Sequence, residues 1–132
     1  MAEHGLEGAV IGVAFDGSGC GSDGAVWGGE FLVASYGGFH RAAHLKYVPL
    51  PGLDEAVRKP FRMAISYLQA AYGPAASELP LSLWERIDPR VAAIVRQQVT
   101  RGLNAPPTSS CGRLFDAVAA LLGVRDTVSY EG

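Results

Sequence analysis

The first residues of this sequence that could do chemistry lie in a glycine-rich segment near its start. Residues 14 to 31 read AFDGSGCGSDGAVWGGEF, and Gly19, Gly21 and Gly24 in it form a G-x-G-x-x-G pattern. Residues without a Cβ can point several backbone N–H groups at one phosphate, and a carboxylate such as Asp16 beside them can hold a metal ion. The segment therefore has two interpretations, a phosphate-binding loop and a hairpin loop whose glycines only satisfy turn geometry.

A dinucleotide-binding helix does not fit the residues around these glycines. That motif needs glycines that follow a strand and open a helix. Residues 9–15 form an apolar, β-branched run of strand type, but residues 25–33 on the other side also read as a strand. The glycine segment is therefore predicted to join two strands.

A second informative group, TSSCGRLFDAVAALLG, covers residues 108–123. Ser109 or Ser110 can cap a helix there, and the unpaired N–H groups of its first turn favour an anion. Asp116 lies about two turns into a helix that is otherwise apolar, so its carboxylate needs either a partner, such as ribose hydroxyls, or a position facing solvent. Arg113, at the helix start, is interpreted as a solvated charge.

The elements that position these residues change character once along the chain. Three strands are expected at residues 9–15, 25–33 and 39–48, joined by glycine turns into an antiparallel meander. Prolines 49 and 51 then end strand pairing because neither can donate to a ladder. Residues 1–49 are thus predicted to be a β-meander, and residues 50–132 to be mainly helical.

Three helices are expected in this second part. The first runs from Asp54 or Pro60 to Tyr72, the second begins at Asp88, and the third ends at Gly123. Spacing predicts two buried stripes, Phe61, Ala64, Ile65 and Leu68 on the first helix and Leu114, Phe115, Val118, Leu121 and Leu122 on the third. A strand starts near Thr127 and the sequence ends within it, so we expect one partial domain.

Composition fits one globular core and narrows the range of partners. Of 132 residues, 48% are hydrophobic, the net charge is −2, and the 11 Lys and Arg residues are scattered. A nucleic-acid partner is therefore not expected, and no apolar stretch approaches the roughly 20 residues of a membrane-spanning helix. Cys20 and Cys111 lie outside metal or redox spacings, and no signal peptide is recognisable, so we expect free thiols in the cytoplasm.

Taken together, these segments resemble a known family. AFDGSGCGSDGAVWGGEFL, AAHLKYVPLPG, RKPFRMAISYL and TSSCGRLFDAVAALLG, followed by VSYEG, occur in this order. The set is similar to the HypF carbamoyltransferases that mature [NiFe] hydrogenases and, more distantly, to threonylcarbamoyl-transferring tRNA-modification enzymes. The resemblance covers nearly the whole chain.

The resemblance implies an α/β fold, a ribonuclease-H-like half of an actin-like ATPase superfamily domain, here truncated. It also implies a chemistry, in which carbamoyl phosphate and ATP give carbamoyl adenylate with release of phosphate and pyrophosphate. The carbamoyl group then passes to the C-terminal cysteine of the partner HypE.

Individual residues inherit roles from this resemblance. Asp16 would be a ligand of a divalent metal ion, with zinc, iron and magnesium all open. Gly17, Gly19 and Gly21 would let the backbone approach the nucleotide phosphates, and Gly112 and Asp116 would belong to the nucleotide pocket, with Asp116 accepting hydrogen bonds from the ribose.

Parts of the family pattern are missing from the sequence. A His-x-x-x-His metal pair, a second glycine-rich phosphate loop and a further metal-binding aspartate have no counterpart in it. We therefore expect the chain to be inactive alone. A non-catalytic module that binds nucleotide or HypE, and a relative of the tRNA-modification enzymes, stay open as alternatives.

Overall fold

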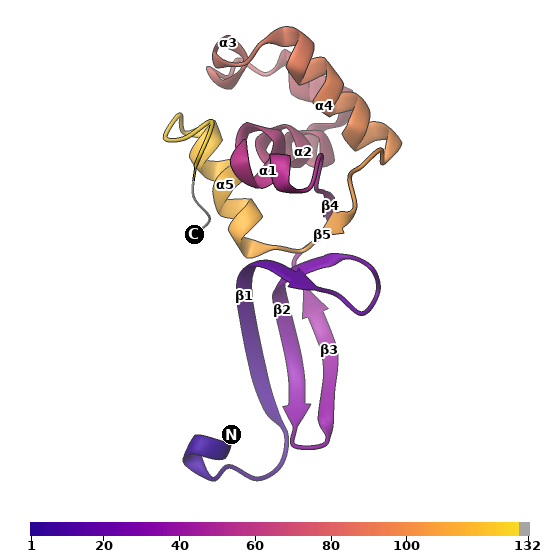
Figure 1. The fold of residues 1–132 in the computed structure, drawn as a ribbon, viewed down its shortest axis with the longest axis vertical. Helices are drawn as coiled ribbons and strands as arrows, with labels where there is room; N and C mark the ends of the chain where they lie inside the picture. Colours follow the sequence, from indigo (N-terminus) through magenta and orange to yellow (C-terminus); the bar gives the residue numbers. More distant parts are fainter. Residues whose placement is uncertain (130–132) are drawn as a thin grey trace.

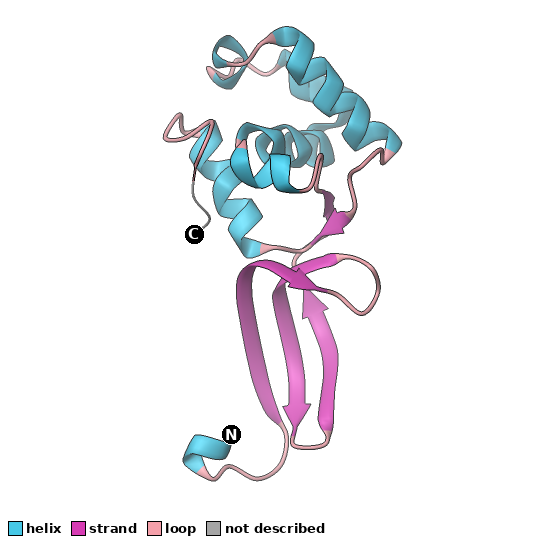
Figure 2. Ribbon diagram, in the orientation of Figure 1, coloured by secondary structure: helices cyan, strands magenta, loops and turns pink. Residues whose placement is uncertain are grey.

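The computed structural model describes residues 1–129, and its first half is a β-meander of three long strands. These are β1 (Val10–Cys20), β2 (Val26–Ser35) and β3 (Gly38–His44), rich in the β-branched and aromatic residues that favour strands. β2 pairs antiparallel with both neighbours. Figure 1 shows the meander projecting from a helical body, and Figure 2 shows the strands and helices as separate groups. The predicted α/β class, a three-stranded antiparallel meander followed by helices, is confirmed.

Two short strands connect the meander to the helices. β4 (Val48–Pro49) and β5 (Pro107–Thr108) pair antiparallel, and β5 also lies parallel to β2 through Thr108 and Val26. The predicted third strand, residues 39–48, is therefore wrong in its second half. Strand β3 ends at His44, and Val48 belongs to a separate strand because the chain turns toward β5 after the Leu45 N–H donates to the Gly29 carbonyl at 2.9 Å.

The glycine segment also differs from its prediction as a loop. β1 continues to Cys20, so residues 16–20 belong to a strand, and the turn is confined to residues 21–25. Phe15 pairs with Gly29 and Gly19 pairs with Trp27, so Asp16, Gly17 and Ser18 together lie opposite Gly28 alone. These three residues form a bulge, the kind of irregularity that redirects side chains and backbone out of a sheet.

The helical body holds the hydrophobic core. Its α-helices are α1 (Asp54–Arg58), α2 (Phe61–Tyr72), α3 (Leu83–Arg86), α4 (Pro89–Arg101) and α5 (Cys111–Leu121), and two 3-10 helices are η1 (Ala2–His4) and η2 (Gly73–Glu78). Helix α2 is central and contacts α4 and α5. Its predicted stripe of Phe61, Ala64, Ile65 and Leu68 is buried, as the 3.6-residue period requires.

Helix α5 buries a different face from the one that its sequence predicts. Phe115 is 68% exposed, and Val118 and Leu122 are exposed as well, whereas Ala117 and Ala120 are fully buried. These alanines belong to the face of α5 that is turned to the core, where small side chains allow the helix to approach α2 closely. Periodicity located the helix correctly, and Leu121 of the predicted stripe packs partly buried against the core, but the prediction was wrong for Phe115, Val118 and Leu122.

The end of the chain carries no strand as far as the structure describes it. Residues 127–129 have no strand conformation, and the Val128 N–H donates to the Arg58 carbonyl at 2.9 Å. Tyr130, where the predicted strand would continue, lies outside the described residues. None of the helices within residues 1–129 is both long and apolar enough to cross a membrane.

Candidate functional site

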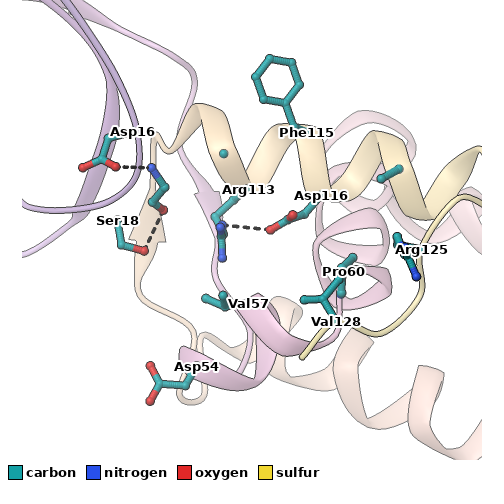
Figure 3. A pocket seen from close by; sticks show the side chains of 13 residues that line it. Asp16, Ser18, Asp54, Val57, Pro60, Arg113, Phe115, Asp116, Arg125 and Val128 are labelled. Carbon is teal, nitrogen blue, oxygen red and sulfur yellow. Dashed lines mark hydrogen bonds and ion pairs between the residues drawn. The ribbon is translucent and has the colours of Figure 1, made fainter. Parts of the chain in front are cut away.

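A pocket of about 680 Å³ lies where the bulge of β1 meets the start of α5. This volume is within the range typical of small-molecule sites. The bulge contributes Asp16, Gly17 and Ser18 to its wall, and α5 contributes Gly112, Arg113, Phe115, Asp116 and Ala119. Residues of α1 and of the segment after α5 complete the lining, and Figure 3 shows these side chains around it.

Ser110 joins the start of α5 to the bulge. Its Oγ accepts a hydrogen bond from the Arg113 N–H at 3.1 Å, which makes Ser110 the N-cap of the helix, one of the two predicted caps. The same hydroxyl lies 3.0 Å from the Asp16 carbonyl and 2.8 Å from the Gly17 carbonyl, to either of which it can donate. A single side chain therefore fixes the helix start against the backbone of Asp16 and Gly17.

Gly17 and Gly112, both predicted to bind nucleotide, meet at this junction. A Cβ built on Gly112 would lie 2.8 Å from the Gly17 Cα, closer than real side chains approach. The glycines thus let a strand and a helix that are distant in sequence come into contact. Packing alone accounts for the glycine at position 112. Both glycines also lie on the pocket wall, a position that is compatible with a nearby phosphate.

Arg113 and Asp116 form the charged part of the pocket. Arg113 is 7% exposed, so its interpretation as a solvated charge is wrong. Its Nε lies 3.0 Å from Oδ2 of Asp116, one helical turn away. Burial raises the pKa of Asp116, and the nearby Arg113 guanidinium offsets only part of this effect. Asp116 therefore has a protein partner, which neither of its two sequence interpretations included.

Of the remaining predicted site residues, Asp16 lines the pocket, and Gly19 and Gly21 do not. Asp16 lies on the pocket wall, and its Oδ1 accepts a hydrogen bond from the Gly17 N–H at 2.6 Å. Gly19 pairs with Trp27 inside the sheet, and Gly21 belongs to the β1–β2 turn, where its N–H donates to the Ala25 carbonyl. The structure does not bring these two glycines to the pocket lining.

A complete metal site is not formed by residues 1–129. No group of three or more His, Cys, Asp or Glu side chains in this range is arranged to hold an ion. Asp16 offers one carboxylate, and divalent ions in proteins take several ligands. Asp16 by itself therefore does not make a metal site within residues 1–129.

A polar cluster behind the pocket was missed by the sequence analysis. Glu30, 3% exposed in the middle of β2, accepts hydrogen bonds from the N–H groups of Gly28 and Gly29, each at 3.1 Å. The Ser109 hydroxyl donates to the same oxygen, Oε1, and the other oxygen, Oε2, lies 2.5 Å from Nε of Arg41 on β3. A charged residue between Gly29 and Phe31 in an otherwise apolar strand was the available signal.

The outer part of this cluster surrounds Arg41. The Arg41 guanidinium lies 4.0 Å from the ring centre of Trp27 and within 3.2 Å of the Asp23 carboxylate. Asp23 also accepts hydrogen bonds from the Tyr47 hydroxyl at 2.6 Å and from the Trp27 indole at 2.8 Å. We name Asp23, Trp27, Glu30, Arg41, Tyr47 and Ser109 the Arg41 cluster.

The Arg41 cluster keeps its two carboxylates ionised. Burial raises the pKa of Glu30, but hydrogen bonds from Arg41 and Ser109 outweigh it and lower that pKa to about 2. The Tyr47 hydrogen bond is the largest influence on Asp23 and, with those from the Ala25 N–H and Trp27, brings its pKa to about 2. Through Ser109, the residue before the Ser110 cap, this cluster reaches the pocket.

Comparison with known protein families gives one match along most of the chain. The family described as "Carbamoyltransferase, Kae1-like Domain, second subdomain" matches residues 12–132. This range includes both the bulge and the start of α5, the two segments that form the pocket.

Relatives of known name agree with this match. The carbamoyltransferase HypF2 of Cupriavidus necator is 44% identical over 137 residues, covering 100% of this chain and 16% of the relative. The carbamoyltransferase HypF of Synechocystis is 38% identical, covering 100% of this chain and 19% of the relative. The chain thus spans less than a fifth of the length of these two relatives.

Solved structures are similar as well. A full-length HypF crystallised in a phosphate- and nucleotide-bound form is 45% identical, with a TM-score of 0.88, over 100% of this chain and 20% of that one. The HypF of T. kodakarensis is 38% identical with a TM-score of 0.81, over 100% of this chain and 18% of that one.

Proposed function

Because the chain belongs to the HypF family of carbamoyltransferases, we propose that it supplies one wall of a nucleotide site used in carbamoyl transfer. The observation that carries this proposal is the pocket between the β1 bulge and α5, which lies inside the part of the chain matched by the family. A nucleotide-bound HypF crystal structure of closely similar fold supports a nucleotide as the ligand.

The reaction proposed for the assembled enzyme consists of an activation and a transfer. In the activation, water hydrolyses carbamoyl phosphate to carbamate and phosphate, and a carbamate oxygen then attacks the α-phosphorus of ATP, which gives carbamoyl adenylate and releases pyrophosphate. The sulfur of the C-terminal cysteine of HypE then attacks the carbamoyl carbon, the bond to the adenylate oxygen breaks, and AMP leaves. The chain spans 16% of its relative HypF2, so we assign it a share of this site and not the whole reaction.

Within that site the chain's residues have distinct proposed roles. Gly17 and Gly112 keep the wall free of side chains, so that a nucleotide can lie against backbone. Asp116, whose Oδ2 is turned to Arg113, has its other oxygen available for a ribose hydroxyl. Asp16 is proposed as one ligand of a divalent ion, which when bound would neutralise phosphate charge. Gly19 and Gly21 have no proposed contact with the ligand.

We expect this chemistry to take place in the cytoplasm. The two cysteines are free thiols in the part of the chain that the structure describes, Cys20 exposed and Cys111 buried. Free, accessible thiols are typical of a reducing compartment.

A second candidate function is nucleotide or HypE binding without catalysis. The observation that favours it is that this chain lines the pocket from two distant segments, the β1 bulge and α5, while residues 1–129 hold no group of three or more metal-ligating side chains. Carbamoyl-phosphate-dependent exchange of pyrophosphate into ATP distinguishes the two functions. Exchange by the 132-residue chain would contradict a purely binding role, whereas nucleotide binding without exchange is expected of it.

A segment exchange tests the catalytic proposal. The matching part of Cupriavidus necator HypF2, 44% identical over 137 residues, is replaced by this chain, and carbamoylation of HypE is followed by intact mass. We expect the chimera to transfer carbamoyl, and Asp116→Asn in it to reduce the rate by about tenfold or more, the effect of one lost hydrogen bond to a charged group. Glu85→Gln, an exposed change on α3 outside the pocket, is the matched control.

A folded chimera that transfers no carbamoyl group would contradict the proposed function. Equal rates for the Asp116→Asn and Glu85→Gln chimeras would leave transfer in place but remove Asp116 from the site.

A further inference from the structure

Arg113 has hydrogen-bonding capacity that the described residues leave unused. A guanidinium carries five N–H donors in a fixed fork and stays charged. Nη1 of Arg113 is buried, yet it has no hydrogen-bond partner within residues 1–129. Because a buried charged donor without a partner is costly, such an atom indicates that a ligand completes its environment.

The ion pair with Asp116 does not remove this need. The Arg113 Nε to Asp116 Oδ2 distance is 3.0 Å, but neither atom makes a hydrogen bond of acceptable geometry in the described part of the chain. Asp116 therefore neutralises charge at one edge of the guanidinium without satisfying its donors. Nη1, at the other edge, has no acceptor within residues 1–129.

Arg113 is part of the pocket wall. Figure 3 shows its side chain between Asp116 and Ser18, and Nη1 is buried in this wall. Its Nη2 lies 3.4 Å from the position that a Cβ on Gly17 would occupy. An acceptor bound at the guanidinium would thus also lie close to the backbone of the bulge.

The charges around Arg113 restrict what this acceptor can be. Asp16, Asp54 and Asp116 line the pocket together with Arg113 and Arg125. The carboxylates outnumber the guanidinium groups, so a small free anion gains little from Arg113 alone. A phosphoryl group held in place by an attached nucleoside does not depend on Arg113 alone, because the nucleoside contributes its own contacts. An arginine fork also matches the geometry of phosphate oxygens.

Resting on the nucleotide site proposed above, we propose that Arg113 binds the phosphoryl group of an adenylate-type ligand through the Nη1–Nη2 edge of its guanidinium, while Asp116 holds its Nε edge. The pair divides recognition in the pocket. Arg113 binds the phosphoryl group, and the second oxygen of Asp116 accepts a hydrogen bond from the sugar.

Comparison of AMP with adenosine tests this assignment, because the two ligands differ only in the phosphoryl group. Affinities are measured by calorimetry for the wild-type chain, Arg113→Gln and Arg113→Lys. We expect the wild-type chain to bind AMP more tightly than adenosine. Arg113→Gln should weaken AMP binding about tenfold or more and leave adenosine binding nearly unchanged, with Arg113→Lys in between.

Arg101→Gln is the matched control. It changes the net charge by the same one unit at the exposed end of α4, outside the pocket lining. We expect its ratio of AMP to adenosine affinity to equal that of the wild-type chain.

Adenosine binding by each variant shows that it has folded. Should Arg113→Gln not fold, the wild-type chain decides, since it is expected to bind AMP more tightly than adenosine. An unchanged ratio of affinities in a folded Arg113→Gln, or equal affinities of the wild-type chain for AMP and adenosine, would overturn the role of Arg113 while nucleotide binding stands. Failure of the wild-type chain to bind either ligand would overturn the proposed nucleotide site and this inference with it.

Discussion

The buried Glu30 carboxylate on β2 accepts a hydrogen bond from the hydroxyl of Ser109, 79 residues further along the chain. Ser109 directly precedes Ser110, whose own hydroxyl caps α5 and holds the backbone of Asp16 and Gly17. The meander and the helical body thus meet through two consecutive serines. Ser109 belongs to the Arg41 cluster, and Ser110 positions the wall of the pocket.

Loss of the Glu30 charge is expected to destabilise the chain strongly. In Glu30→Gln, Arg41 loses its 2.5 Å ionic partner, and removal of one member of a buried ion pair costs about 3 kcal/mol. The free energy of unfolding is measured by urea denaturation. Glu55→Gln removes an exposed partner of Lys59 at 2.6 Å and should cost less than about 1 kcal/mol.

A double-mutant cycle with Ser109→Ala completes this measurement. Coupling between Glu30→Gln and Ser109→Ala is expected because the two side chains share a hydrogen bond, whereas Glu55→Gln and Ser109→Ala should add independently. Equal costs for Glu30→Gln and Glu55→Gln would show that the Arg41 cluster contributes little to stability.

Stability should fall steeply as the solution becomes acidic. The pKa of Glu30 is lowered from 4.5 to about 2 in the folded chain, since hydrogen bonds from Arg41 and Ser109 outweigh burial. Between these two values the unfolded chain binds more protons than the folded one, so the free energy of unfolding decreases as pH falls. One proton of difference corresponds to at most about 1.4 kcal/mol per pH unit.

Denaturation at several pH values between 5 and 2 checks this dependence. Glu30→Gln should flatten the curve, because the substituted side chain does not titrate. A curve for Glu30→Gln parallel to that of the wild-type chain would mean that other carboxylates dominate the acid response.

The sequence predicted those features that depend on local rules. The buried stripe of α2 follows from helical periodicity, and the cap at Ser110 follows from its hydroxyl beside an apolar run. The meander follows from glycine turns between β-branched runs. Asp16, Gly17, Gly112 and Asp116, to which the family resemblance assigned metal and nucleotide contacts, all line the pocket, and these contacts stay predictions.

Features that depend on contacts between distant segments were not accessible in this way. The bulge that carries Asp16 and Gly17 arises from the register of β1 on β2, which no local pattern specifies. The exposed position of Phe115 and the burial of Arg113 depend on which face of α5 meets α2. Glu30 and Arg41 find each other only after β2 and β3 have paired.

Because Gly112 contacts Gly17, helix propensity and packing predict opposite effects of Gly112→Ala on stability. Alanine is favoured over glycine inside a helix by about 1 kcal/mol, so Gly112→Ala in the first turn of α5 would stabilise an isolated helix. In the folded chain the new Cβ would lie 2.8 Å from the Gly17 Cα. Overpacking of this kind costs about 1–3 kcal/mol, so we expect a net loss of stability.

Gly37→Ala is the matched control for this substitution. Gly37 lies in the β2–β3 turn, where the nearest atom to an added Cβ would be the Ser35 Oγ at 3.8 Å and the backbone needs no positive φ. Its change in unfolding free energy should stay within about 0.5 kcal/mol. Because the displaced segment is the pocket wall, Gly112→Ala should also weaken AMP binding and Gly37→Ala should not. A Gly112→Ala chain that is more stable than wild type and binds AMP equally well would show that helix and bulge can separate without consequence for the site.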